Sequence, residues 1–163
     1  QELTILHACL DKALQGEGQF VTVVGEAGVG KSRLHYEFRH RLDREKITVL
    51  QGRCQSYGSD IPYLPFIDAL RRGLHLIEED SPVELLEKAV TNIKAIDPSL
   101  EQFIPLYLHL LSIQSDYPLP AHLQGKELRK AMEEALAAII TLNTQNRPMV
   151  MILEDWQILL LQI

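Results

Sequence analysis

The sequence predicts an α/β fold in which helices cover a mostly parallel β-sheet and a large helical insertion precedes the third strand. Short apolar runs at 20–24 and 47–50 flank a helical stretch, and a third run lies much later, at 149–153. Runs that are apolar at nearly every position are typical of strands covered on both faces. Strand, helix and strand in close succession form a parallel βαβ unit, here over 20–52. The length of 163 residues suits one domain.

The first third of the chain alternates between helical and extended patterns. Leucines at three- and four-residue steps predict a first helix at 2–15. The strand at 20–24 follows, then a helix at 33–44 and a strand at 47–50. Glycine, serine and proline mark 52–62 as a loop.

Residues 63–142 carry a helical pattern. Ser81-Pro82-Val83-Glu84 is a capping box with proline in the first turn, which predicts a helix start. The apolar stripe of 124–142 predicts core packing rather than a cofactor site. The predicted helical segments are 63–77, 81–94, a segment from Asp97 that Pro105 bends or divides, and 124–142.

The segment Gly25-Glu26-Ala27-Gly28-Val29-Gly30-Lys31-Ser32 has the spacing of a phosphate-binding P-loop between a strand and a helix. Glycines let successive N–H groups point at a phosphate, and the following helix adds the positive end of its dipole. Lys31 would reach the β- and γ-phosphates, and Ser32 would ligate Mg²⁺. The predicted nucleotide-contacting residues are Gly25, Glu26, Ala27, Gly28, Val29, Gly30, Lys31, Ser32 and Arg33.

The alternative is an ordinary strand-to-helix turn, but such a turn needs no Lys-Ser pair at this spacing. The dinucleotide fingerprint G-x-G-x-x-G is excluded, because the glycines fall at 25, 28 and 30.

Glu154 and Asp155 follow the third apolar run directly, and the carboxyl end of such a strand is where ligands bind in open α/β sheets. We assign Glu154 to the metal and Asp155 to the attacking water, and the sequence also allows the reverse assignment. Alone, the pair would be interpreted as a polar strand end. The P-loop upstream favours a catalytic role for Glu154, Asp155 and Lys31.

Composition and missing motifs exclude several other functions. The net charge of −6 argues against a nucleic-acid partner, and the lysines and arginines from Lys31 to Lys46 are interpreted as a solvated helix face. Cys9 and Cys54 fit no metal or redox spacing, which favours reduced thiols in the cytoplasm. No secretory signal or membrane-length apolar run is visible, no H-E-x-x-H or G-x-S-x-G motif occurs, and the guanine-reading Asn-Lys-x-Asp is missing.

With these motifs in place, the chain resembles the AAA-type, STAND-class ATPase domains of bacterial multidomain signalling proteins, above all the module beside adenylate/guanylate cyclase domains. The resemblance rests on GEAGVGKSRL (25–34), ITVLQGRCQSYGSDIPYLPFIDALR (47–71) and RPMVMILEDWQ (147–157). It implies an ATP–Mg²⁺ switch that gates an attached cyclase, kinase or transcriptional effector and is followed by helical repeats.

The chain also departs from that family. The Gly-Arg-Glu box that usually opens such a domain is replaced by Gln1-Glu2-Leu3, and an apolar tail at 158–163 replaces the usual continuation after Trp156. The resemblance implies a further strand between the P-loop strand and the acidic strand, so we interpret the chain as part of a larger ATPase. The alternatives are a domain that binds nucleotide without turnover, a GTPase, and an interaction module that uses 63–142.

Overall fold

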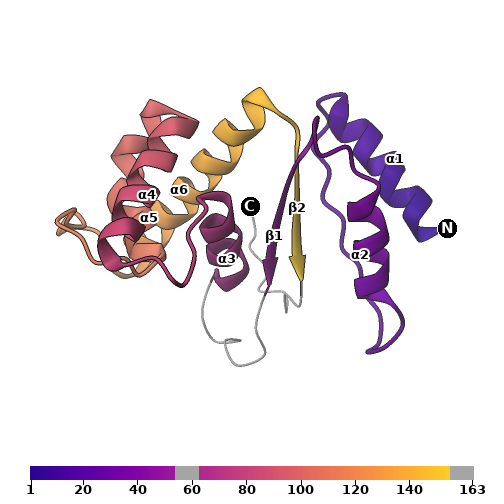
Figure 1. Cartoon of the computed structure of the whole chain (residues 1–163), viewed down its shortest axis with the longest axis horizontal. Helices are drawn as coiled ribbons and strands as arrows, with labels where there is room; N and C mark the ends of the chain where they lie inside the picture. The colour runs from indigo at the N-terminus through magenta and orange to yellow at the C-terminus, as the bar shows by residue number, and fades with distance from the viewer. Residues whose placement is uncertain (54–62, 155–163) are drawn as a thin grey trace.

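The computed structural model describes residues 1–53 and 63–154 and shows a layered α/β arrangement (Figure 1). The elements in chain order are α1 (Glu2–Leu14), α2 (Lys31–His40), β1 (Thr48–Arg53), α3 (Leu64–Gly73), α4 (Pro82–Ile96), the 3₁₀ helix η1 (Pro98–Phe103), α5 (Ile104–Leu110), α6 (Gly125–Asn146) and β2 (Met149–Glu154).

The two strands of the described sheet, β1 and β2, pair in parallel, from Thr48 opposite Met149 to Arg53 opposite Glu154. Helices cover both faces of the pair, with α1 and α2 on one side and α3 to α6 on the other (Figure 1). The predicted parallel α/β architecture and its helical insertion before the acidic strand are therefore confirmed.

The helical side holds the larger core, which α3, α4, α5 and α6 build with η1. Its largest fully buried side chains include Tyr107, Ile93 and Ile104. The predicted stripe of α6 contributes to this side, since Leu136 and Ile139 are buried. Pro105 lies in the first turn of α5, so it divides the segment after Asp97 into two helices as predicted.

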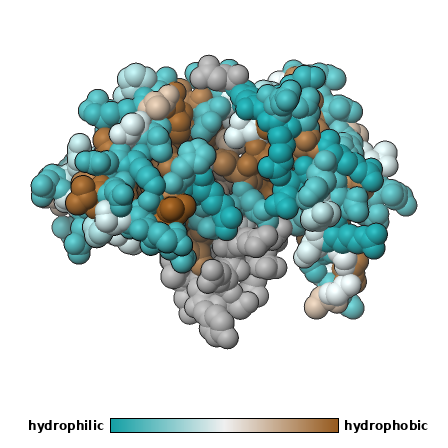
Figure 2. Space-filling view, viewed as in Figure 1, coloured by the Kyte–Doolittle hydropathy of each residue, from teal (hydrophilic) through white to brown (hydrophobic). Residues whose placement is uncertain are grey.

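A smaller core joins α1 and α2 to the opposite face of the strands. Phe38, Leu42 and Ile47 are buried there against leucines of α1 and against Val49 and Val150 of the sheet. The surface seen from the same direction is mostly hydrophilic, with hydrophobic atoms visible between the two halves (Figure 2).

The prediction of a strand at 20–24 is wrong. These residues have no regular secondary structure, and Phe20 and Val24 keep more than four fifths of their surface exposed (83% and 84%). A strand needs a neighbour that supplies a hydrogen-bond ladder, and within the described residues no backbone hydrogen bond gives 20–24 such a neighbour. The predicted βαβ unit over 20–52 is present only as α2 and β1.

Candidate phosphate-binding site

The loop before α2 has a backbone that only glycine adopts readily. Gly28 and Gly30 have φ values of +86° and +97°, in the left-handed region, and Gly30 is the N-cap of α2. An ideal Cβ on either residue would meet no atom within 4 Å, so backbone conformation rather than crowding requires glycine here. The predicted role of these glycines therefore has a conformational basis.

Gly25 lies close to another residue of the loop. A Cβ at this position would lie 2.9 Å from Cγ2 of Val29, because the loop folds back on itself. Gly25, Glu26, Ala27, Gly28, Val29 and Gly30 are all exposed, so the loop presents its backbone to solvent. A loop of this shape, open on its outer side, can accept a ligand without rearranging a core.

Lys31 is bound to the loop that precedes it. Its ammonium nitrogen donates hydrogen bonds to the backbone oxygens of Gly25 and Glu26, each at 2.8 Å. An ammonium group has three N–H donors, so one donor remains for another acceptor. The side chain is thus held across the loop, next to the N-terminus of α2.

The first turn of α2 adds further donors and positive potential. Ser32 and Arg33 follow Lys31 in this turn and are exposed, and the turn contains no acidic side chain. The unpaired N–H groups and the dipole of the helix therefore keep their positive character. This end of α2 is suited to an anion, and the hydroxyl of Ser32 is an oxygen donor of the kind that Mg²⁺ prefers.

The second predicted half of the site lies at the end of β2. Figure 1 shows the carboxyl ends of both strands at the same end of the molecule as the loop before α2. The strand reaches Glu154 with its backbone, while Asp155 lies outside the described residues. The loop before α2 and the carboxyl end of β2 thus lie at the same end of the molecule. The roles of Glu154 and Asp155 stay predictions.

The donor set at the loop fits a nucleotide phosphate with Mg²⁺. It combines a glycine backbone with open N–H groups, one ammonium and one hydroxyl, with no acidic side chain in the first helical turn. Within 1–53 and 63–154, no group of three or more His, Cys, Asp or Glu side chains could hold a metal by itself. A metal at this site would therefore be shared between Ser32, oxygens of the ligand and the predicted acidic ligand Glu154.

Comparison with known proteins decides the family. The family model described as "AAA ATPase domain" matches residues 1–160. The chain belongs to this family. Membership agrees with the P-loop geometry, and AAA ATPase domains generally bind ATP with Mg²⁺.

A curated relative of this AAA ATPase domain is the "Uncharacterized protein R02095" of Rhizobium meliloti (strain 1021). The two are 26% identical over 156 residues, which cover 94% of this chain and 15% of the relative. The chain thus spans about 15% of the length of that protein. No solved structure matches the chain. Among the described helices, none is long and apolar enough to cross a membrane.

The backbone oxygens of Gly25 and Glu26 are the part of the site that the sequence analysis missed. They hold the Lys31 ammonium, yet every residue carries such an oxygen, so no residue type marks them. The loop folds back far enough for these oxygens to meet a side chain five and six residues later, which only the coordinates reveal.

Proposed function

We propose that this AAA ATPase domain is an ATP–Mg²⁺-binding regulatory switch of a larger signalling protein, in which ATP hydrolysis gates an attached effector. The observation that carries the proposal is the position of Lys31, held across an open glycine loop at the start of α2. The family match over residues 1–160 supports nucleotide binding, and the short coverage of the relative agrees with a domain of a larger protein.

The phosphate-binding step is an exchange of partners. The ammonium of Lys31 would leave one or both carbonyl oxygens and donate to the β- and γ-phosphates of ATP. Backbone N–H groups of 25–30 and the first turn of α2 would hold the remaining phosphate oxygens. Because the same ammonium serves two sets of acceptors, the loop has one arrangement with nucleotide and another without it, as a switch requires.

The residues for hydrolysis follow the sequence assignment. Ser32 and Glu154 would hold Mg²⁺, which neutralises charge on the phosphates when it is bound. Asp155 would accept a proton from the attacking water and orient it towards the γ-phosphate. The order of the two acidic residues stays open, because either can take either role.

Calorimetric titration of the chain with ATP and Mg²⁺ tests the binding step. We expect saturable binding that Lys31→Ala weakens by roughly a hundredfold or more, since a charge-assisted contact to each of two phosphates is lost. Lys46→Ala is the matched control, because Lys46 is exposed and lies outside the loop. Folded protein that binds no Mg·ATP, or equal affinity in both variants, would overturn the proposal.

A phosphate-release assay separates a hydrolase from a domain that only binds nucleotide. We expect wild-type release above background and its loss in Asp155→Asn and in Glu154→Gln, with Mg·ATP binding retained in Asp155→Asn. Background release by all three proteins would favour the binding-only alternative. Competition between ATP and GTP for the loop tests the GTPase alternative, and we expect ATP to win.

A further inference from the structure

The outer edge of β1 has no partner strand among the described residues. β1 pairs only with β2 among the described strands, and Thr48 N–H donates to the oxygen of Pro148 at 2.9 Å. Alternate residues of a strand direct their N–H and C=O groups to opposite sides. Thr48 and Leu50 therefore bond towards β2, while the backbone groups of Val49 and Gln51 point away from it. No backbone bond to Val49 or Gln51 occurs at that open side within the described residues.

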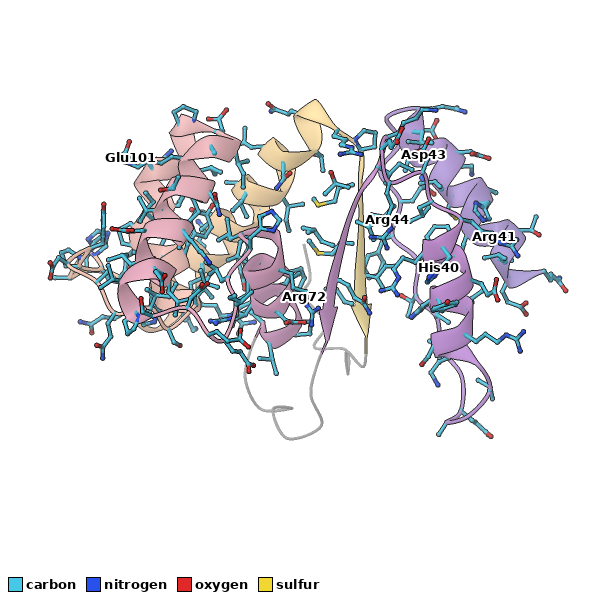
Figure 3. The ribbon with its side chains drawn as sticks, viewed as in Figure 1. His40, Arg41, Asp43, Arg44, Arg72 and Glu101 are labelled. Carbon is cyan, nitrogen blue, oxygen red and sulfur yellow. The ribbon has the colours of Figure 1, made fainter. Side chains whose placement is uncertain are left out.

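A groove of about 350 Å³ lies along this open edge. Residues 48–51 form its floor, α2 and the turn after it supply Arg39 and Arg44, and α3 with the next residues supplies Arg72 and His75. Figure 3 places Arg44 on the α2 side of the strands and Arg72 on the α3 side. We call this feature the edge groove. Its shape, a strand edge between two helical walls, suits one further strand.

The walls of the edge groove are basic. The titratable residues that line it are Arg39, Arg44, Arg72 and His75, and no acidic residue is among them. This is unusual in a chain with a net charge of −6. Arg72 is partly neutralised by Asp68, at 3.1 Å.

The charges of the two arginines on the α2 side, Arg39 and Arg44, are less neutralised by carboxylates than the charge of Arg72. Arg39 donates to the side-chain oxygen of Gln51, but its Nε is buried with no partner. Arg44 is exposed, and no described carboxylate is paired with its guanidinium. The exposed guanidinium of Arg44 therefore offers an uncompensated charge and free donors to an anionic ligand at this wall.

We propose that the edge groove binds an acidic, extended segment of a partner protein, which adds to β1 as a further strand. The main chain of the segment would form hydrogen bonds with the outward-facing backbone N–H and C=O groups of Val49 and Gln51, and these bonds would supply the affinity. Its carboxylates would face Arg39 and Arg44, and this pairing of charges would select acidic segments over basic ones. Pairing of β1 with β1 of a second copy is disfavoured, because it would bring the same arginines together. The proposal is independent of the nucleotide site.

Fluorescence anisotropy with a labelled acidic peptide, in which glutamate alternates with valine, tests the proposal on the folded chain. We expect saturable binding at least roughly tenfold tighter than that of the peptide with lysine in place of glutamate, because charge complementarity sets the selectivity. The variant Arg44→Glu should weaken binding by roughly tenfold or more, while Lys46→Glu, with the same charge change in the same turn as Arg44, should leave it unchanged.

Backbone pairing is tested from the peptide side, so that the protein stays intact. N-methylation of alternate peptide amides removes the donors of one edge only, so one of the two alternating sets should abolish binding and the other should not. Hydrogen exchange should slow at Val49 and Gln51 when the peptide is bound. Lys31→Ala should bind the peptide like wild type, which separates this site from the nucleotide loop.

Three results would overturn the proposal. Equal binding of the acidic and lysine peptides would show that the arginines do not select the ligand. Equal binding of both N-methylated peptides would show that no strand is added. Displacement of the acidic peptide by inorganic phosphate or by single-stranded RNA at equal charge concentration would show a general anion site instead.

Discussion

Gly52 of β1 touches the backbone of Pro65 in α3 so closely that no side chain fits between them. An ideal Cβ on Gly52 would lie 1.8 Å from the carbonyl oxygen of Pro65 and 2.7 Å from its carbonyl carbon. Both atoms belong to backbone, so neither can rotate away. This contact fixes the distance between the sheet and the first helix of the insertion.

Gly52→Ala should therefore destabilise the fold strongly. We expect a loss of about 3 kcal/mol in the free energy of unfolding, because α3 must move away from β1. Urea unfolding followed by circular dichroism measures it. Gly18→Ala is the control: a Cβ there meets nothing within 4 Å. It should change stability by less than about 0.5 kcal/mol. Equal stabilities of the two variants would contradict the packing argument.

Gly30→Ala should damage the loop through backbone strain. An L-residue at a φ of +97° costs about 1–2 kcal/mol, and relief of that strain would turn the N–H groups before α2 away from a phosphate. We expect a lower free energy of unfolding together with weaker Mg·ATP binding, measured by urea unfolding and calorimetry. A variant that loses stability but binds Mg·ATP as tightly as wild type would show that the conformation of Gly30 does not matter for the ligand.

Tyr107 links α5 to α6 and gives a pH-dependent prediction. Its hydroxyl donates to the backbone oxygen of Ala135 at 2.7 Å, and the side chain is fully buried. Tyr107→Phe should cost about 1 kcal/mol at neutral pH, as is typical of one buried hydrogen bond.

Burial also raises the pKa of the Tyr107 phenol above its ordinary value of 10.0. Above pH 10 the unfolded chain loses this proton while the folded chain keeps it, so the stabilisation falls as pH rises. The slope is about 1.4 kcal/mol per pH unit. The stability difference between wild type and Tyr107→Phe should therefore shrink between pH 10 and 11. A difference that stays constant in urea unfolding at these pH values would contradict the burial argument.

The capping box at the start of α4 gives a prediction at acid pH. The side chain of Ser81 accepts from Glu84 N–H at 3.3 Å, and Glu84 accepts from Ser81 N–H at 2.8 Å. Ser81→Ala should cost about 1 kcal/mol of stability. The hydrogen bonds from Ser81 lower the pKa of Glu84 below its ordinary value of 4.5. Its contribution is therefore present above pH 4.5 and lost as pH falls through the lowered pKa.

Glu84→Gln is the control for this pH effect, because the amide oxygen can accept the same hydrogen bond without titrating. Thermal unfolding of wild type should lose stability more steeply below pH 4.5 than that of Glu84→Gln. Parallel curves for the two proteins would show that the carboxylate of Glu84 adds nothing to the cap.

Short sequence patterns predicted most of the helices, because helix formation and capping depend on residues close together in the chain. The leucine spacing of 2–15 and the Ser81 to Glu84 cap gave helices close to the observed α1 and α4. The strand predicted at 47–50 is longer in the structure, Thr48–Arg53, because the ladder with β2 continues through Gly52, where α3 packs. Helix ends shifted as well, since the helix predicted at 33–44 is Lys31–His40 and the one predicted at 63–77 ends at Gly73.

The sequence by itself determined the glycine loop before α2, because eight consecutive residues carry the motif and its glycines tolerate the required backbone. Only the tertiary structure decided which apolar runs become strands, since a strand exists through its neighbour and 20–24 finds none among the described residues. It also decided that Arg39 and Arg44, predicted to lie on a solvated helix face, line a groove with Arg72. Residues from two helices and a strand edge meet there only after the chain has folded, so no spacing in the sequence could indicate it.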